Sequence, residues 1–129
     1  MQLKQLIAIN KFTHKGRLIG LNEYTSSNRA NRYGANAQKK KIENDIIKSI
    51  RASKLAKVGK YPVKLKITWY EPNKRRDVDN ITFAVKFIQD ALVKAEILEN
   101  DGQKQIHEIE HTVLTDRDNP RIEVEILKG

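Results

Sequence analysis

The chain contains no cysteine, only one tryptophan and three prolines, and no long apolar run. Without cysteine there can be no disulfide, no thiolate zinc site and no cysteine nucleophile. The longest apolar run near the start is Leu6-Ile7-Ala8-Ile9, which is too short for a signal-peptide core or a membrane span. We therefore expect a soluble, cytoplasmic protein that does not bind membranes, although the absence of cysteine alone does not exclude an oxidising compartment.

Positive charge is what the sequence has in excess. It carries 25 Lys and Arg against 16 Asp and Glu, which gives a net charge of +9 and a pI of about 9.8. Its 129 residues are enough for one domain, which we expect to span residues 1–129 and to bury a core without disulfides or structural metal. A small domain this basic usually binds a polyanion, most often nucleic acid.

Hydrophobic periodicity predicts an α+β (mixed α/β) fold. Val63, Leu65, Ile67 and Trp69 alternate with more polar residues, so they indicate a strand with one buried face. In the N-terminal part we predict a short strand at Leu3, Ile7 and Ile9, a basic loop over 10–24, and a loop or lid over 25–37. A helix over 35–57 and a strand over 63–70 follow. We then predict a helix from 79 or 80 to about 95 and two strands, over 105–115 and 121–127. Residues 116–120 are predicted to be a hairpin loop. The order, about β-α-β-α-β-β, predicts a small mixed sheet covered by two main helices.

Acids and cations are concentrated at one point of the chain. Three cations, Lys74, Arg75 and Arg76, directly precede two acids, Asp77 and Asp79. A third acid, Asp101, follows the next predicted helix. Carboxylates beside positive charge suit a site that holds Mg²⁺ against a phosphate backbone. For Asp101 to join the other two acids, the strand that follows it must run back beside the strand that ends before Asp77.

The same residues also have a purely structural interpretation. Asp79 or Asn80 can cap the helix that follows, and Asn100-Asp101-Gly102 is an ordinary turn sequence. In that case the chain would be a non-catalytic basic DNA-binding module, in which the acids are caps and turns. The spacing of the acids does not decide between the two interpretations.

Three short motifs together resemble a known family. They are Arg75-Arg76-Asp77-Val78-Asp79-Asn80, Asp90-Ala91-Leu92-Val93-Lys94-Ala95 and Asn100-Asp101-Gly102-Gln103. Over residues 74–106 this combination is similar to the RusA family of Holliday junction resolvases. The resemblance implies a homodimeric, Mg²⁺-dependent endonuclease that nicks two opposed strands of a four-way DNA junction symmetrically, in recombination and repair. Such proteins are common in phages and prophages, which implies a viral origin. A less specific Mg²⁺-dependent nuclease for branched DNA is a nearby alternative.

The resemblance also assigns roles to individual residues. Asp77, Asp79 and Asp101 would be the catalytic acids that bind the metal, and Arg76 would hold a backbone phosphate next to them. The family also has a lysine early in the helix after the acidic pair.

The position of that lysine is where the chain departs most from the family. The closest matching position is Phe83, and a lysine occurs instead at Lys86, about one helical turn later. Lys86 is our candidate for the catalytic lysine, because it is seven residues after Asp79 and so shares a helix face with it. The alternative is a solvated lysine paired with Asp90. Asn100 also replaces an acid of the family pattern.

Other candidates for DNA contact lie outside these motifs. Arg29, Arg32 and Tyr33 belong to a polar segment whose side chains could reach phosphates or stack on an unpaired base. Lys74 and Arg75 are expected to bind the DNA backbone beside the acids. The stretch Asn22-Glu23-Tyr24 resembles a sequence that precedes the first helix in some relatives, and it is a weaker candidate.

One further motif suggests a different enzyme class. His107-Glu108-Ile109-Glu110-His111 fits the zinc peptidase pattern, which requires a helix so that both histidines reach one metal. On a strand the two side chains would lie about 13 Å apart. Because the surrounding residues favour a strand, we expect two half-exposed histidines and no zinc hydrolase.

Overall fold

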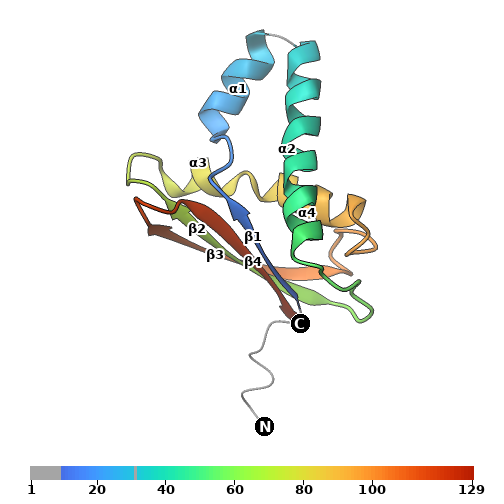
Figure 1. Ribbon diagram of the computed structural model, residues 1–129. Helices are drawn as coiled ribbons and strands as arrows, with labels where there is room; N and C mark the ends of the chain where they lie inside the picture. The colour runs from blue at the N-terminus through green and yellow to red at the C-terminus, as the bar shows by residue number, and fades with distance from the viewer. Residues whose placement is uncertain (1–9, 31) are drawn as a thin grey trace.

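The sheet and its helices form the predicted α+β fold. The computed structural model describes residues 10–30 and 32–129, without the side chains of residues 32 and 33. The elements are β1 (Asn10–Lys15), α1 (Leu21–Ala30), α2 (Arg32–Ala52), β2 (Val63–Glu71), α3 (Val78–Thr82), α4 (Val85–Lys94), β3 (Ile106–Thr115) and β4 (Arg121–Lys128). The strands form one mixed sheet in the order β1-β4-β2-β3, and the helices lie on one side of it (Figure 1).

The core lies between this sheet and the helices. The alternation in β2 is confirmed, because every second side chain from Val63 to Glu71 is buried. Trp69 and Ile67 from β2 pack in one cluster with Phe87 and Leu92 from α4. No helix among the described residues has both the length and the hydropathy that a membrane span requires.

The predicted hairpin over residues 116–120 is wrong. The third and fourth strands are not neighbours, since β2 lies between them, parallel to β3 and antiparallel to β4. The reason is burial: β2 has the longest apolar row and takes a central position, whereas β3 has only one fully buried residue, Ile106. The α3–α4 segment is the crossover connection that a parallel pair of strands requires.

The predictions for the N-terminal third are mostly wrong. The strand expected at Leu3, Ile7 and Ile9 lies outside the described residues. Residues 10–24 are not a loop, because they contain β1, which pairs with β4, and the start of α1. Residues 25–37 are not a loop or lid either, because α1 and α2 occupy most of them. Among the described residues α1 buries no side chain, so there was no apolar periodicity for the sequence to show.

Both main helices differ from their predicted bounds. The first was expected over 35–57 and runs over 32–52, with Ile46 and Ile50 buried as the apolar stripe predicts. The second was expected to be continuous and is divided into α3 and α4 around Phe83. There the bonds from Ala84, Lys86 and Phe87 N–H reach back only three residues, to Ile81, Phe83 and Ala84. Such tighter turns rotate α4 relative to α3.

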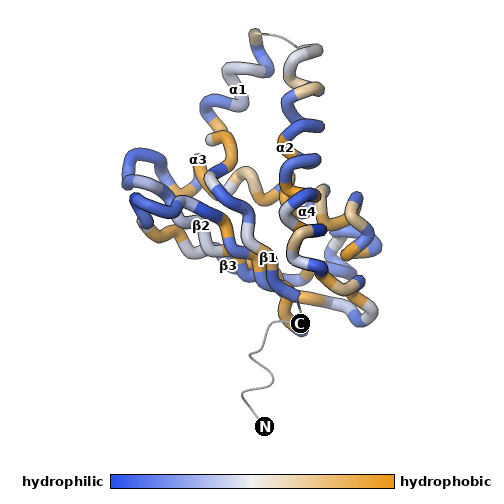
Figure 2. Tube along the Cα trace, in the orientation of Figure 1, coloured by the Kyte–Doolittle hydropathy of each residue, from blue (hydrophilic) through white to orange (hydrophobic). Residues whose placement is uncertain are grey.

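The face of the sheet that the helices leave uncovered is not a basic surface. Its side chains on β2, β3 and β4 include Lys64, Lys66, Glu108, Glu110, Arg121, Glu123 and Glu125. Lys64 Nζ lies 3.2 Å from Glu108 and 2.9 Å from Glu110. Lys11 and Lys15 of β1, which pair with Glu125 and Arg121, also lie on this face, so it carries both charges in nearly equal number and forms no positive patch for a DNA backbone. In Figure 2, α1 and the upper part of α2, on the other side, are mostly hydrophilic or neutral in colour.

His14 in β1 makes the stability of the fold depend on pH. Its Nδ1 lies 2.7 Å from Ser49 Oγ of α2, and burial lowers the pKa of His14, partly opposed by Asp45. The unfolded chain therefore takes up a proton near pH 6.5, above the range in which the folded protein does. We expect the free energy of unfolding to fall as the pH drops below about 6.5, by at most about 1.4 kcal/mol per pH unit for this group.

Urea unfolding of the wild type and His14→Asn across this pH range measures the effect. The variant should show a shallower pH dependence. Some dependence should remain, because burial also lowers the pKa of His111. Equal slopes for the two proteins would contradict the assignment to His14.

Candidate functional site

Asp77 and Asp79 lie where the chain leaves β2 and enters α3. Arg75 N–H donates a 3.0 Å hydrogen bond to Asn73 Oδ1, which closes a tight turn in this loop. Asp77 has extended backbone angles, with φ −70° and ψ 155°, and Asp79 is in the first turn of α3. Both residues are exposed. The loop therefore presents two acids to solvent at one end of the sheet (Figure 1).

The capping interpretation of these acids does not hold. Asp77 is at the N-cap position of α3, but its side chain makes no capping hydrogen bond. Asn80 does not cap α3 either, because its Oδ1 accepts a 3.0 Å hydrogen bond from Asn22 N–H in the first turn of α1. Neither carboxylate, of Asp77 or Asp79, has a hydrogen bond or ion pair to another described residue. Both carboxylates are thus available to a cation.

Arg76 is directed into the protein. Its guanidinium donates to Leu18 O at 2.9 Å and lies 2.7 Å from Glu23 Oε1 of α1 and 4.0 Å from Glu71 Oε1. Only 12% of its side chain is exposed. These contacts fix the residue before Asp77 to α1 and to the end of β2. Its predicted role as a phosphate contact stays a prediction.

Glu71 is a residue of this region that sequence reasoning missed. It ends β2, and its side chain is 4% exposed, 3.3 Å from Arg17 and 4.0 Å from Arg76. A buried carboxylate is costly unless it is paired, so two arginines next to it are expected. The available signal was the alternation itself, because Glu71 continues the buried row of Val63 to Trp69.

Asp101 and Lys86 are in contact with each other. Lys86 Nζ lies 3.1 Å from Asp101 Oδ2 and 3.2 Å from Asp90 Oδ1. The alternative pairing with Asp90 therefore occurs, together with a contact to Asp101 that was not predicted. The predicted shared helix face with Asp79 is wrong, because Asp79 belongs to α3 and Lys86 to α4. The hydrogen bond to Asp101, followed by that to Asp90, raises the pKa of Lys86, which therefore stays cationic at neutral pH.

Asp101 does not join Asp77 and Asp79 within the described part of one chain. The strand after Asp101 does lie beside β2, but it is parallel to β2 and so does not run back along it as the prediction required. Because the pair is parallel, β3 begins where β2 begins, and Asp101 precedes that end whereas Asp77 follows the other. Figure 1 shows the two loops on opposite sides of the molecule. The described residues contain no group of three Asp, Glu, His or Cys side chains placed to hold one metal.

The remaining predicted DNA contacts are spread over the helical side. Lys74 and Arg75 are exposed on the loop that carries Asp77, and Arg29 is exposed on α1. The side chains of Arg32 and Tyr33 lie outside the described residues, and their backbone belongs to α2. The stretch from Asn22 to Tyr24 contacts the chain's own α3 region, since Asn22 meets Asn80 and Glu23 meets Arg76.

The zinc peptidase interpretation is excluded by secondary structure. His107 and His111 are both on strand β3. His107 Nδ1 lies 3.0 Å from Val63 O, and His111 Nδ1 accepts a 3.0 Å hydrogen bond from Trp69 Nε1. The two rings have separate partners within the sheet, so they do not share a metal.

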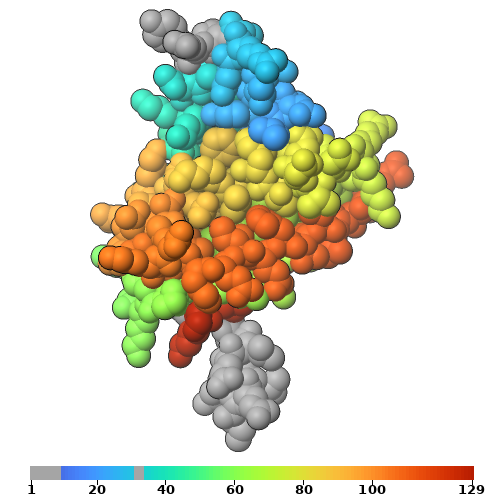
Figure 3. All heavy atoms as spheres, turned by 180° about the vertical axis from the view of Figure 1, so that it is seen from behind, coloured from blue at the N-terminus to red at the C-terminus, as the bar shows by residue number. Residues whose placement is uncertain are grey.

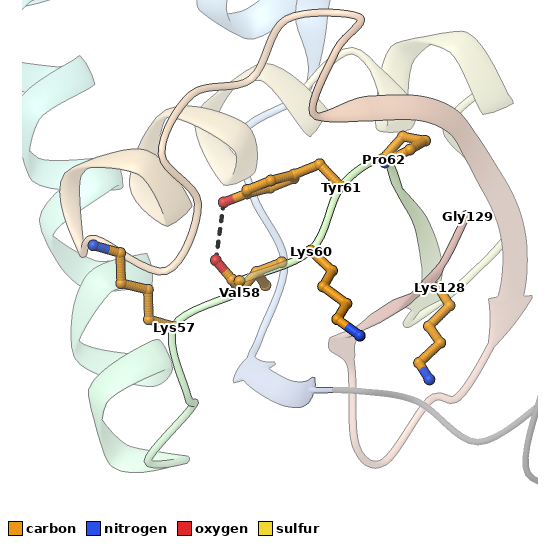
Figure 4. Close-up of a pocket in the computed structure, with 8 residues that line it drawn as sticks. Lys57, Val58, Lys60, Tyr61, Pro62, Lys128 and Gly129 are labelled. Atoms are coloured by element: carbon orange, nitrogen blue, oxygen red, sulfur yellow. Dashed lines mark hydrogen bonds between the residues drawn. The ribbon is translucent and has the colours of Figure 1, made fainter.

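A hollow lies away from the acids, where β2 begins and β4 ends. It has a volume of about 370 Å³, and Lys57, Lys60 and Lys128 are among its lining residues (Figure 4). Tyr61 Oη donates a 3.2 Å hydrogen bond to Val58 O beside it. No Asp or Glu of the described residues lines this hollow, so it lacks the side-chain carboxylates by which proteins usually hold Mg²⁺.

The acidic loop does fit such a cation. Mg²⁺ prefers oxygen ligands, retains several waters, and is often held by one or two carboxylates together with a substrate phosphate. Asp77 and Asp79 supply two exposed carboxylates without competing partners. The exposed Lys74 and Arg75 on the same loop can attract the phosphate.

Comparison with known proteins identifies the family of the chain. The family model described as Endodeoxyribonuclease RusA matches residues 10–127, nearly the whole chain. The match includes β1, the four helices of the described residues and both acidic turns. A comparison with curated protein sequences gave no match.

Proposed function

The chain belongs to the RusA family of endodeoxyribonucleases and is therefore a Holliday junction resolvase, and we propose that Mg²⁺ held by Asp77 and Asp79 supports its cleavage of DNA. We also propose that it acts in the cytoplasm, in DNA recombination and repair, by paired symmetrical nicks. The observation that carries the metal proposal is the pair of exposed carboxylates without partners on a loop that also exposes two cations.

The cations around the acids, Lys74, Arg75 and Arg76, have different roles at this loop. When bound, Mg²⁺ would activate a water and neutralise charge on the leaving oxygen. Lys74 and Arg75 attract the phosphate backbone towards the acids. Arg76 holds the loop in place through its contacts with Leu18 and Glu23. Junction selectivity would come from shape and backbone contacts rather than from direct reading of base edges.

We further propose that the active form is a homodimer. A four-way junction has two-fold symmetry, and a C₂ dimer places two copies of one site on equivalent strands. The position of Asp101 supports this, because it lies at the opposite end of the sheet from Asp77. A two-fold axis perpendicular to the strands reverses the direction of the sheet in the second copy, so it can bring the Asp101–Lys86 pair to the partner's Asp77 and Asp79.

The proposal is tested with a synthetic four-way junction and a linear duplex of the same sequence. We expect paired symmetrical nicks in the junction alone, and only with Mg²⁺ present and chelator absent. Cleavage of flaps or forks at equal rates would instead indicate a general branched-DNA nuclease. Tight junction binding without cleavage in any divalent metal would refute the metal proposal and favour the binding module.

A further inference from the structure

Three consecutive residues of helix α1 contact the segment that carries the acids. Asn22 N–H donates to Asn80 Oδ1 at 3.0 Å, and Glu23 lies 2.7 Å from Arg76. The ring of Tyr24 lies 5.8 Å from that of Phe83, between centroids. Two of the partners, Arg76 and Asn80, directly flank the acids in sequence. The position of α1 is thus fixed relative to Asp77 and Asp79.

A groove lies along this junction of α1 with the start of the α3–α4 segment. It has a volume of about 620 Å³ and is lined by Leu21, Tyr24, Thr25, Asn28, Arg29 and Phe83. The first five residues follow one face of α1 at helical spacing. In Figure 3, which shows the molecule from behind, α1 in blue lies directly against the yellow α3 region. The volume is in the range of small-molecule sites.

The groove adjoins the acidic loop. Phe83 is four residues after Asp79, and its N–H donates to Asp79 O at 3.2 Å, so the aromatic ring follows one helical turn after that acid. Leu21, at the start of α1, is 39% exposed although it is apolar. Among the described residues α1 buries no side chain. Tyr24 and Phe83 are half-buried, with their rings 5.3 Å and 5.8 Å from that of Phe87, so an apolar and aromatic strip stays partly open to solvent next to the proposed site of cleavage.

From this geometry we infer that the groove binds one nucleobase of the junction, next to the phosphate that is cleaved. This inference rests on the proposed function of the acidic loop. The rings of Tyr24 and Phe83 offer surfaces on which a base can stack, and every base has a face suited to such stacking. Thr25 and Asn28 provide hydrogen-bonding groups, and the exposed Arg29 adds a positive charge for the backbone.

A nucleobase fits this groove better than an apolar protein segment does. Arg29 lines the groove and is exposed, and Lys74 and Arg75 are exposed on the loop that carries Asp77. These cations complement a phosphate chain rather than a hydrophobic partner. Bases at a junction crossover are also easier to unstack than bases within a continuous duplex, which lowers the cost of placing one in a protein pocket. The groove would then make the cleavage rate depend on the base at that position.

The test combines one protein variant with one change in the DNA. Cleavage rates are measured for the wild type and for Phe83→Leu, on a junction with a complete base next to the cleaved phosphate and on the same junction with an abasic site there. We expect either change alone to lower the rate about tenfold, a size consistent with the loss of one base–aromatic stack. We expect the two changes together to lower it no further.

Tyr70→Leu is the matched control, because it removes an aromatic ring from the uncovered sheet face, where Arg121 lies 3.7 Å from the ring centroid. On each of the two junctions, the cleavage rate of Tyr70→Leu should equal that of the wild type. Multiplicative effects of Phe83→Leu and the abasic site, or equal wild-type rates on both junctions, would overturn the inference. So would a change in the oligomeric mass of Phe83→Leu, which would make the groove a protein interface. Failure of the wild type to cut either junction would instead refute the proposed function.

Discussion

Asp77→Asn is expected to abolish cleavage of a four-way junction while leaving junction binding intact. Asparagine keeps the size and one oxygen of the side chain but removes the charge that holds the metal. We expect the rate to fall by about 10²- to 10³-fold or more, the scale seen when a group that stabilises charge in the transition state is lost. Binding in the presence of chelator should be equal to or slightly tighter than that of the wild type, because a negative charge near phosphate has been removed.

The control for this variant is Glu125→Gln. Glu125 faces Lys66 on the uncovered side of the sheet, so the substitution also removes one negative charge, away from the loop. Its cleavage rate should stay close to that of the wild type. Loss of binding by Asp77→Asn under metal-free conditions would show that Asp77 has a structural role and that its catalytic assignment is wrong.

Mixing two inactive variants shows whether each active site is formed by one chain or shared between the two chains of a dimer. Asp77→Asn and Asp101→Asn should each be inactive alone. If Asp101 serves the partner's site, a mixed dimer contains one site with both acids intact, and nicking should return after subunit exchange. If both acids serve the site of their own chain, the mixture should stay inactive.

The acidic loop could be recognised from sequence because its chemistry is local. Asp77, Asp79 and the cations before them are adjacent in the chain, so their proximity needs no knowledge of the fold. Asp101 is different, since its position depends on whether β3 runs parallel or antiparallel to β2. The sequence shows that β3 is a strand, but its direction follows from the crossover through α3 and α4 and from the central position of β2.

The contacts of Arg76 and Asn80 within the fold could not be predicted for a related reason. Both belong to the motif that carries the resemblance, and the sequence assigned them to phosphate binding and to capping of the following helix. Their partners, Glu23 and Asn22, are more than fifty residues away in a helix that has no apolar periodicity. Such contacts depend on the tertiary position of α1, which local patterns do not encode.

Glu71→Ala is expected to cause the largest loss of stability among substitutions at the site. The Glu71 carboxylate is buried between Arg17 and Arg76, and Arg76 itself is only 12% exposed. Removing the acid leaves a cation largely buried with one partner fewer, and it opens a gap at the end of β2. Breaking a buried pair on one side costs about 3–5 kcal/mol. We expect about 3 kcal/mol here, because Arg17 is partly exposed and can be solvated.

For a domain of this size, such a loss lowers the melting temperature by roughly 10 °C, measurable by circular dichroism or calorimetry. Glu71→Gln keeps the volume and one acceptor oxygen, so its loss should be clearly smaller than that of Glu71→Ala. Cleavage should fall in both variants even well below their melting temperatures, because Arg76 loses one of the contacts that hold the residue before Asp77. A melting temperature of Glu71→Ala equal to that of the wild type would show that the two arginines are adequately solvated without the acid. In that case Arg76 would hold the loop through Leu18 and Glu23 alone.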